Sequence, residues 1–266
     1  VGSSAPGATS VYSGDSVWQC RRSAPLAPPS EVLRRVAALN KSEPTTKPRN
    51  NRKLRRLADH LFAHYVTLRG RAKEDRVSGA DAALLYLVVA ATRAVTTGET
   101  GFASGTSALA MLAALGPNGT HVAIDPFQGR FDFAGVRGVA TYRANRLAAK
   151  RGPRSAPRFV HINETASFGL AWLAKRRTCF DVFLMDDGHK FDDNMVELYS
   201  VSKMLSIGGV LFVHDAWLPS VQKTAAFIKS SLPFLKPLPR KLMPGTMQLY
   251  VKLGLDERRW NTFQDF

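Results

Sequence analysis

Short apolar runs alternate with helical segments through most of the chain, and this alternation limits the fold more than any other feature of the sequence. The runs DVFLM and GGVLFV are apolar at successive positions, as strands covered on both faces are. We expect strands at residues 120–124, 158–162, 181–185 and 210–213. We expect the intervening helices at residues 106–115, 139–150, 167–175 and 194–205. This order predicts a doubly wound α/β domain with helices on both faces of a mostly parallel sheet.

The composition agrees with a folded enzyme-sized domain. The chain has 266 residues, of which 45% are hydrophobic, so it can bury a sizeable core and is not an unfolded chain. Cys20 and Cys179 are its only cysteines, which allows one bridge at most and excludes a disulfide scaffold. The longest apolar run, residues 82–91, is shorter than the roughly 20 residues of a membrane-spanning helix. We therefore expect no membrane span.

The first part of the chain differs from the rest. Residues 1–51 are rich in Ser, Pro, Ala and Arg and carry no strand period, which predicts a flexible basic extension. Residues 52–266 are expected to form the domain, with helical spacing at 54–68 and an apolar helix at 79–94. The compartment stays open, because the extension is compatible with a lost anchor or transit segment. The sequons at Asn118 and Asn163 are short enough to arise by chance.

The net charge of +16 raises the question of a nucleic-acid partner. Residues 137–158 hold seven Arg and Lys side chains without an acid, and such a stretch can bind a polyanion. Tyr142 is the only aromatic residue among them, whereas surfaces that bind single-stranded RNA interleave aromatics with charges. A solvated helix face is the favoured interpretation.

Two consecutive strand ends carry the features of a nucleoside site. The segment GETGFASGTS, residues 98–107, joins a strand to the helix ALAMLAAL. Its Gly101 and Gly105 allow a tight turn, and the amides of the new helix point at whatever lies there. Asp125 ends the next strand about 20 residues later, where a carboxylate can accept hydrogen bonds from ribose hydroxyls. A helix cap is the simpler interpretation of either feature alone, but together they favour a binding site.

Polar residues also follow the fourth and fifth strands. Asp186 and His189 follow FLM, and Asp215 follows the fifth strand. Because the carboxyl ends of parallel strands meet at one edge of a sheet, we expect these three side chains to converge. A helix-capping role for Asp186 is the alternative. His214 is expected to be a core-edge histidine bonded to backbone.

Four segments resemble class I S-adenosylmethionine-dependent methyltransferases: ETGFASGTS at 99–107, IDPFQ at 124–128, FLMDDGHKFD at 183–192 and GGVLFVHDAWLPSV at 208–221. The likeness is to the small O-methyltransferase branch, which includes sugar and antibiotic-tailoring enzymes and the catechol type. It implies a Rossmann-like seven-stranded sheet in which the last strand, residues 247–252, runs antiparallel. The first strand departs from the family pattern, since Thr96 and Thr97 replace apolar residues.

The resemblance also implies roles for individual residues. Those expected to bind S-adenosylmethionine are Glu99, Gly101, Phe102, Gly105, Ser107, Asp125, Glu164, Thr165 and Asp186. In metal-dependent members, acids at the positions of Asp186 and Asp215 bind Mg²⁺, or Mn²⁺ as a substitute. His189 occupies the position of the catalytic base, and an imidazole titrates in a useful range. Ala216 stands where catechol-type members offer a third metal ligand.

We therefore expect methyl transfer to a hydroxyl of a small molecule or saccharide, with Mg²⁺ assistance and a histidine base. Two alternatives stay open: an RNA methyltransferase, and a catalytically silent domain of the same fold that docks polyanions. A nicotinamide-dependent oxidoreductase is disfavoured because the glycine spacing is not G-x-G-x-x-G.

Overall fold

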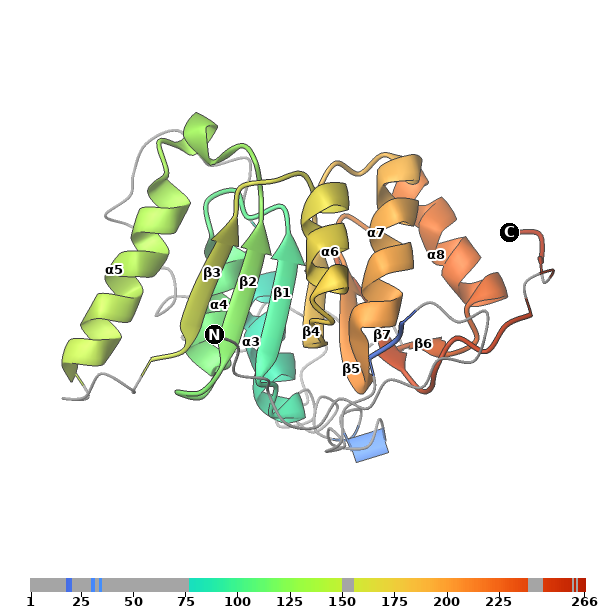
Figure 1. Cartoon of the computed structure of the whole chain (residues 1–266), viewed down its shortest axis with the longest axis horizontal. Coiled ribbons are helices and arrows are strands. Elements are labelled where there is room, and N and C mark those ends of the chain that lie inside the picture. Colours follow the sequence, from blue (N-terminus) through green and yellow to red (C-terminus); the bar gives the residue numbers. More distant parts are fainter. Residues whose placement is uncertain are drawn as a thin grey trace, which may run out of the picture.

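The fold is built around one seven-stranded sheet (Figure 1). The structure is a computed structural model, and it describes residues 18–20, 30–31, 34, 77–149, 156–238, 246–259, 261 and 263–266. The strands are β1 (Thr96–Thr100), β2 (Thr120–Ile124), β3 (Arg158–Ile162), β4 (Phe180–Met185), β5 (Leu205–Val213), β6 (Leu235–Pro237) and β7 (Gln248–Lys252). Their spatial order is β3-β2-β1-β4-β5-β7-β6.

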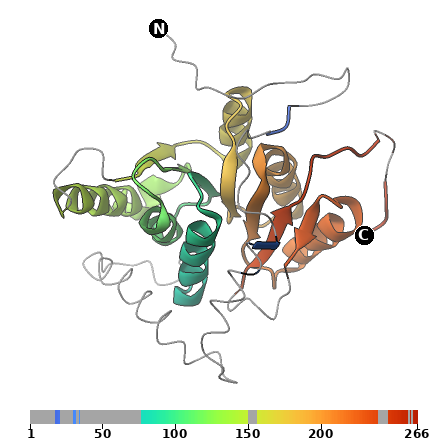
Figure 2. The same cartoon turned by 90° about the horizontal axis from the view of Figure 1, so that it is seen from below.

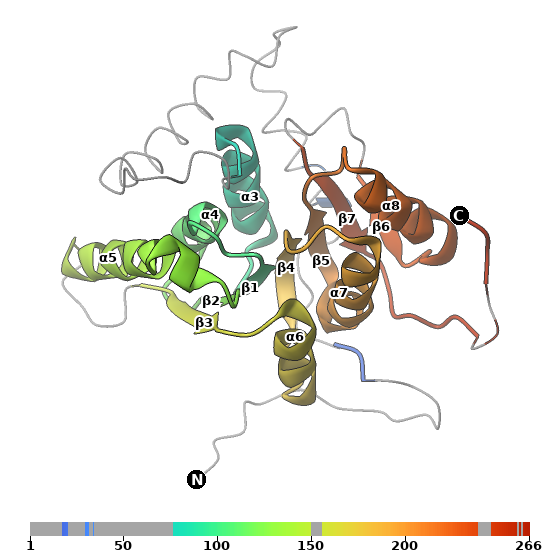
Figure 3. The same ribbon diagram turned by 90° about the horizontal axis from the view of Figure 1, so that it is seen from above.

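The strand directions match the expectation. β1 to β5 pair in parallel, whereas β7 pairs antiparallel with both β5 and β6. The predicted doubly wound sheet with an antiparallel last strand is confirmed. The carboxyl ends of β1, β2 and β3 point to the upper edge in Figure 1, and Figure 3 looks down on that edge. We call it the carboxyl edge.

Helices cover both faces of the sheet. α3 (Gly79–Thr92), α4 (Thr106–Ala114) and α5 (Ala134–Ala149) contribute to one apolar cluster. α6 (Ala166–Lys175), α7 (Phe191–Met204) and α8 (Pro219–Ser231) contribute to the other. Figures 2 and 3 show α3 and α4 on the opposite side of the sheet from α6 and α7. The alternating residues of β2, β4 and β5 divide between the two clusters, as for Phe183 and Leu184 of β4.

The polar first strand is fully buried in the middle of the sheet. Thr97, Glu99 and Thr100 are each 0% exposed, and each contacts a polar side chain from another element. The Thr97 hydroxyl lies 2.9 Å from Nδ1 of His121, while Nε2 of the same ring lies 3.2 Å from Oε1 of Glu99. The Thr100 hydroxyl donates to Glu197 at 2.6 Å. These contacts compensate for the cost of burying polar groups.

β5 and α5 begin well before their predicted starts. β5 starts at Leu205 rather than at 210, because the strand continues through a register shift opposite β4 with Gly208 at φ +83°. α5 starts at Ala134 rather than at 139. It follows η2 (Gln128–Phe131) and two left-handed residues, Asp132 and Phe133, that redirect the chain.

Little of the predicted extension can be compared with the structure. The helical spacing at 54–68 and most of residues 1–51 lie outside the described residues. The exceptions are residues 30–31 and 34, which are helical, and the segment 18–20, where Cys20 forms a disulfide with Cys179. Among the described residues, none of the helices has the length and apolar character needed to cross a bilayer.

Candidate active site

The glycine turn after β1 lies directly against the residues that follow β4. Gly101 has φ +76°, and its N–H donates to the Ile124 carbonyl at 3.0 Å. A Cβ at this position would lie 1.9 Å from the carbonyl oxygen of Asp186, so only glycine fits. Gly105, at φ +75°, is the N-cap of α4. The turn and Asp186 therefore form one compact unit at the carboxyl edge.

Asp125 holds this turn to the end of β2. Its carboxylate accepts from the N–H of Ala103 at 2.7 Å, from the N–H of Phe127 at 2.6 Å and from Nε2 of Gln128 at 3.3 Å. Two carboxylate oxygens offer about four acceptor positions, so about one is left for a ligand. Asp125 thus has a capping role, which was the simpler interpretation of this residue from the sequence.

The other residues expected to bind the cofactor differ in exposure. Glu164 and Thr165 are exposed at the start of α6. Ser107 is buried in the first turn of α4. The Phe102 ring is 1% exposed and packs against Phe159 in the core, which leaves its backbone as the part near the turn. Oε2 of Glu99 is buried and has no hydrogen-bond partner among the described residues.

Asp186, His189 and Asp215 converge as predicted. Nε2 of His189 lies 3.1 Å from Oδ2 of Asp215 and 3.7 Å from Oδ1 of Asp186. One ligand atom from each of the three lies within 4.8 Å of the others. His189 and Asp215 both adopt left-handed backbone, with φ +51° and +49°. Such conformations in non-glycine residues often occur at functional sites.

The expectation for His214 was wrong. Its side chain interacts with acids and a hydroxyl rather than with backbone. Nδ1 lies 2.8 Å from Oδ1 of Asp186 and 3.4 Å from Oδ1 of Asp215. Nε2 lies 3.1 Å from the Thr246 hydroxyl and 4.0 Å from Oδ2 of Asp81. His214 therefore joins the acids of the site to the start of α3 and the loop before β7.

Burial and neighbouring charges act in opposite directions on the pKa values of Asp186 and His214. Burial raises the pKa of Asp186 despite the two nearby histidines. Burial also disfavours the charged form of His214, but Asp186, Asp215 and Asp81 outweigh it and raise the pKa of this imidazole. The site thus favours a cationic group between its carboxylates.

Glu197 lies beneath the glycine turn and was not identified from the sequence. It is 2% exposed and accepts from the hydroxyl of Thr100, the residue before Gly101. Burial, together with the charges of Asp187 and nearby acids, raises its pKa to about 8. Burial at this position accordingly favours the neutral form of Glu197. The helical position of Glu197 gave no sign of its contact with Thr100.

The donor set is compatible with a divalent cation. Two carboxylates and one imidazole approach each other from the ends of β4 and β5. Carboxylates suit Mg²⁺ and Mn²⁺, and an added imidazole favours Mn²⁺ over Mg²⁺. His214 competes with such an ion, because its ring already faces both carboxylates.

Solved structures with the same fold are methyltransferases. The chain is similar to the O-methyltransferase TomG from Streptomyces achromogenes, solved with S-adenosylmethionine, at 18% identity and a TM-score of 0.51, over 77% of this chain and 92% of that one. It is also similar to an O-methyltransferase from Bacillus cereus solved with S-adenosylhomocysteine. The identity is 17% and the TM-score 0.52, over 83% of this chain and 100% of that one. The third is the S-adenosylhomocysteine-bound methyltransferase PaMTH1 from Podospora anserina. The identity is 16% and the TM-score 0.54, over 79% of this chain and 100% of that one. A search of curated protein sequences finds no match.

The sheet order and these likenesses show the fold of the class I S-adenosylmethionine-dependent methyltransferases. Residues 99–216 match the family model of a methyltransferase domain. Its fold is that of these methyltransferases.

Proposed function

We propose that this methyltransferase acts on a hydroxyl group of a small molecule or saccharide and that His189 is the general base. The observation that carries the proposal is the position of the imidazole. His189 lies beside Asp215 and Asp186, and Asp186 packs directly on the glycine turn expected to hold the cofactor. This arrangement supports a base that lies beside the methyl donor.

S-adenosylmethionine supplies an electrophilic methyl group on a sulfonium. The residues of this chain then have three tasks: to hold the donor, to orient the acceptor oxygen and to take its proton. Glu99, Asp125 and the turn at Gly101 and Gly105 serve the first. His189 takes the proton, and its neighbour Asp215 stabilises the imidazolium that results.

A divalent cation at Asp186 and Asp215 would lower the pKa of a bound hydroxyl. Nε2 of His189 faces both carboxylates, so it would be the third ligand of such an ion, and Nδ1 of the same ring would be left to take the proton. The exposed ring of Trp217, which donates to Oδ1 of Asp215 at 3.1 Å, offers a flat surface beside the site on which an acceptor can stack.

The basic surface gives less support to an RNA substrate. Arg146, within the basic stretch, donates to the carbonyls of Leu112 and Leu115 at the end of α4. This guanidinium therefore stabilises the domain and is not free for phosphate. We expect RNA binding to be weak, unselective for sequence and steeply reduced by salt.

The experiment combines calorimetry and turnover. S-adenosylhomocysteine is titrated with and without Mg²⁺ or Mn²⁺, and its formation from S-adenosylmethionine is followed with a panel of sugars and catechols. His189→Ala should lower turnover about 10²–10⁴-fold and leave S-adenosylhomocysteine affinity unchanged. Asp186→Asn and Asp215→Asn should abolish any metal dependence.

The outcomes separate the parts of the proposal. If the wild type keeps its activity in EDTA and His189→Ala is still impaired, the metal is excluded and the role of His189 as base stands. Full turnover in His189→Ala contradicts the base. Tight, sequence-selective RNA binding would favour the RNA methyltransferase, and absence of S-adenosylhomocysteine binding would favour the silent domain.

A further inference from the structure

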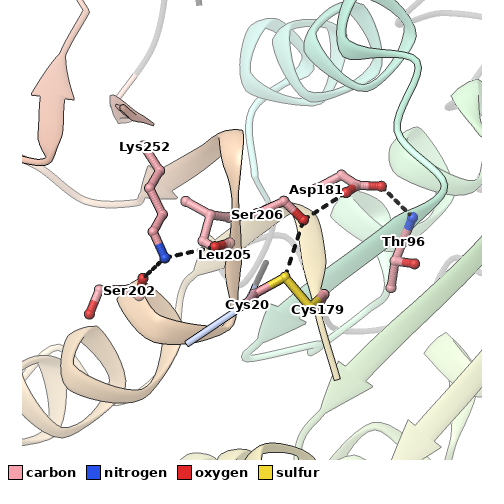
Figure 4. The surroundings of a disulfide bond; sticks show 8 residues. All are labelled: Cys20, Thr96, Cys179, Asp181, Ser202, Leu205, Ser206 and Lys252. Atoms are coloured by element: carbon pink, nitrogen blue, oxygen red, sulfur yellow. Dashed lines mark hydrogen bonds between the residues drawn. A yellow bond between two sulfur atoms is a disulfide. The ribbon is translucent and has the colours of Figure 1, made fainter. Parts of the chain in front are cut away.

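The disulfide is an integral part of the fold, at the edge of the sheet opposite the active site. It joins Cys20 to Cys179, the residue before β4, across 159 positions of sequence. Cys20 is 0% exposed, and its N–H donates to the Lys203 carbonyl at 2.8 Å. Figure 4 shows the bridge beside Ser206, where the Cys20 sulfur lies 3.6 Å from the hydroxyl.

A structural bridge of this kind has a consequence for where the chain matures. Thiols stay reduced in the cytosol, whereas disulfides form and persist in the endoplasmic reticulum, in later secretory compartments and outside the cell. Cys20 and Cys179 are the only cysteines, so no other pairing competes. The same secretory route exposes asparagine sequons to glycosylation.

One sequon lies where a glycan has room. Asn118-Gly119-Thr120 occupies the turn between α4 and β2, closed by the Gly119 N–H donating to the Gly116 carbonyl at 2.9 Å. Asn118 is exposed, and a Cβ added at Gly116 would meet nothing within 4 Å. Because this turn precedes β2, it lies at the amino end of the strand, away from the carboxyl edge (Figure 2).

The second sequon provides an internal contrast. Asn163-Glu164-Thr165 follows β3 at the carboxyl edge and includes two residues expected to contact the cofactor. Asn163 is also exposed, but a glycan on it would stand beside the site, whereas one on Asn118 would not.

We propose that the chain matures in an oxidising secretory compartment and carries an N-linked glycan on Asn118. In the step, the Asn118 amide nitrogen bonds to the anomeric carbon of a lipid-linked oligosaccharide. The bond from that carbon to the lipid diphosphate breaks, and the amide loses one proton. The glycan covers an open turn and leaves the methyltransferase site free. This inference does not depend on the identity of the methyl acceptor.

The test uses the full chain, with a C-terminal tag, isolated without reductant from the cells that make it. Peptide mass spectrometry before and after treatment with peptide-N-glycosidases F and A measures whether each sequon carries a glycan. These enzymes release the glycan and convert the occupied asparagine to aspartate. The same digest, with free thiols blocked first, shows whether the Cys20 and Cys179 peptides are linked.

Four variants make the assignment specific. Asn118→Gln and Thr120→Val should each abolish the glycosidase-dependent shift, while Thr120→Ser should retain it. Asn163→Gln should not change it. Removing the glycan should leave S-adenosylhomocysteine affinity unchanged, because the turn lies at the other edge of the sheet. Free thiols in the isolated protein, an unmodified Asn118, or a glycan on Asn163 alone would each overturn the proposal.

Discussion

Nδ1 of His214 lies 2.8 Å from Oδ1 of Asp186, although the first follows β5 and the second follows β4. Asp186 borders the glycine turn, because its carbonyl oxygen would lie 1.9 Å from a Cβ at Gly101. The imidazole is held from the other side by the Thr246 hydroxyl. His214 is therefore the link between the candidate catalytic acids and the surrounding fold.

Replacing His214 should disturb Asp186 more than it disturbs the fold. His214→Leu leaves a buried carboxylate without its partner, which typically costs about 1–3 kcal/mol of unfolding free energy, and should lower turnover at least tenfold. His214→Asn places an amide N–H near the position of Nδ1 and should recover most of both losses. Urea unfolding and steady-state kinetics of the two variants measure this. If His214→Leu and His214→Asn lose the same stability and turnover, His214 has a packing role only.

Removing the Asp125 carboxylate should weaken cofactor binding. Hydrogen bonds to charged groups contribute about 1.5–3 kcal/mol, so Asp125→Ala should weaken S-adenosylhomocysteine roughly 10-fold to 100-fold by calorimetry. Gln128→Met is the matched control. It removes the Gln128 bonds to Ala103 and to Asp125 and loosens the turn without removing the acid. A similar loss in both variants would mean that Asp125 only holds the turn.

Glu197 should make the stability of the protein depend on pH. Its pKa is raised from an ordinary 4.5 to about 8, mainly by burial, so between these values the folded state holds a proton that the unfolded state has lost. Stability from this group is complete below pH 4.5 and is lost as pH rises toward 8. Glu197→Gln keeps an acceptor for Thr100 and does not titrate. The free energy of unfolding of the wild type, relative to this variant, should fall from pH 5 to pH 8. If the unfolding free energies of the wild type and of Glu197→Gln change in parallel with pH, the raised pKa of Glu197 is contradicted.

Breaking the disulfide should lower stability without changing the site. Cys20→Ser with Cys179→Ser should cost about 2–5 kcal/mol of unfolding free energy, the usual range for a native bridge. S-adenosylhomocysteine affinity should be retained, since the bridge lies at the opposite edge of the sheet. Reducing the wild type with dithiothreitol is the control and should reproduce the loss. Unchanged stability in both cases would show that the bridge does not constrain the chain.

Much of the fold was predictable from local sequence. Strand and helix periods are properties of neighbouring residues, and the runs DVFLM and GGVLFV can be covered only inside a sheet. The convergence of Asp186, His189 and Asp215 was also predictable, because parallel strands deliver their carboxyl ends to one edge whatever the side-chain packing.

Other contacts were decided only by tertiary structure. Asp81 resembles an ordinary residue at a helix start, yet it lies near His214 and bonds Thr246 across 165 positions of sequence. Thr100 and Glu197 are 97 positions apart. Each sequence segment by itself is compatible with solvent exposure at these residues. Which polar side chains face each other in the interior depends on how α3 and α7 pack on the sheet, and burial then sets their charge states.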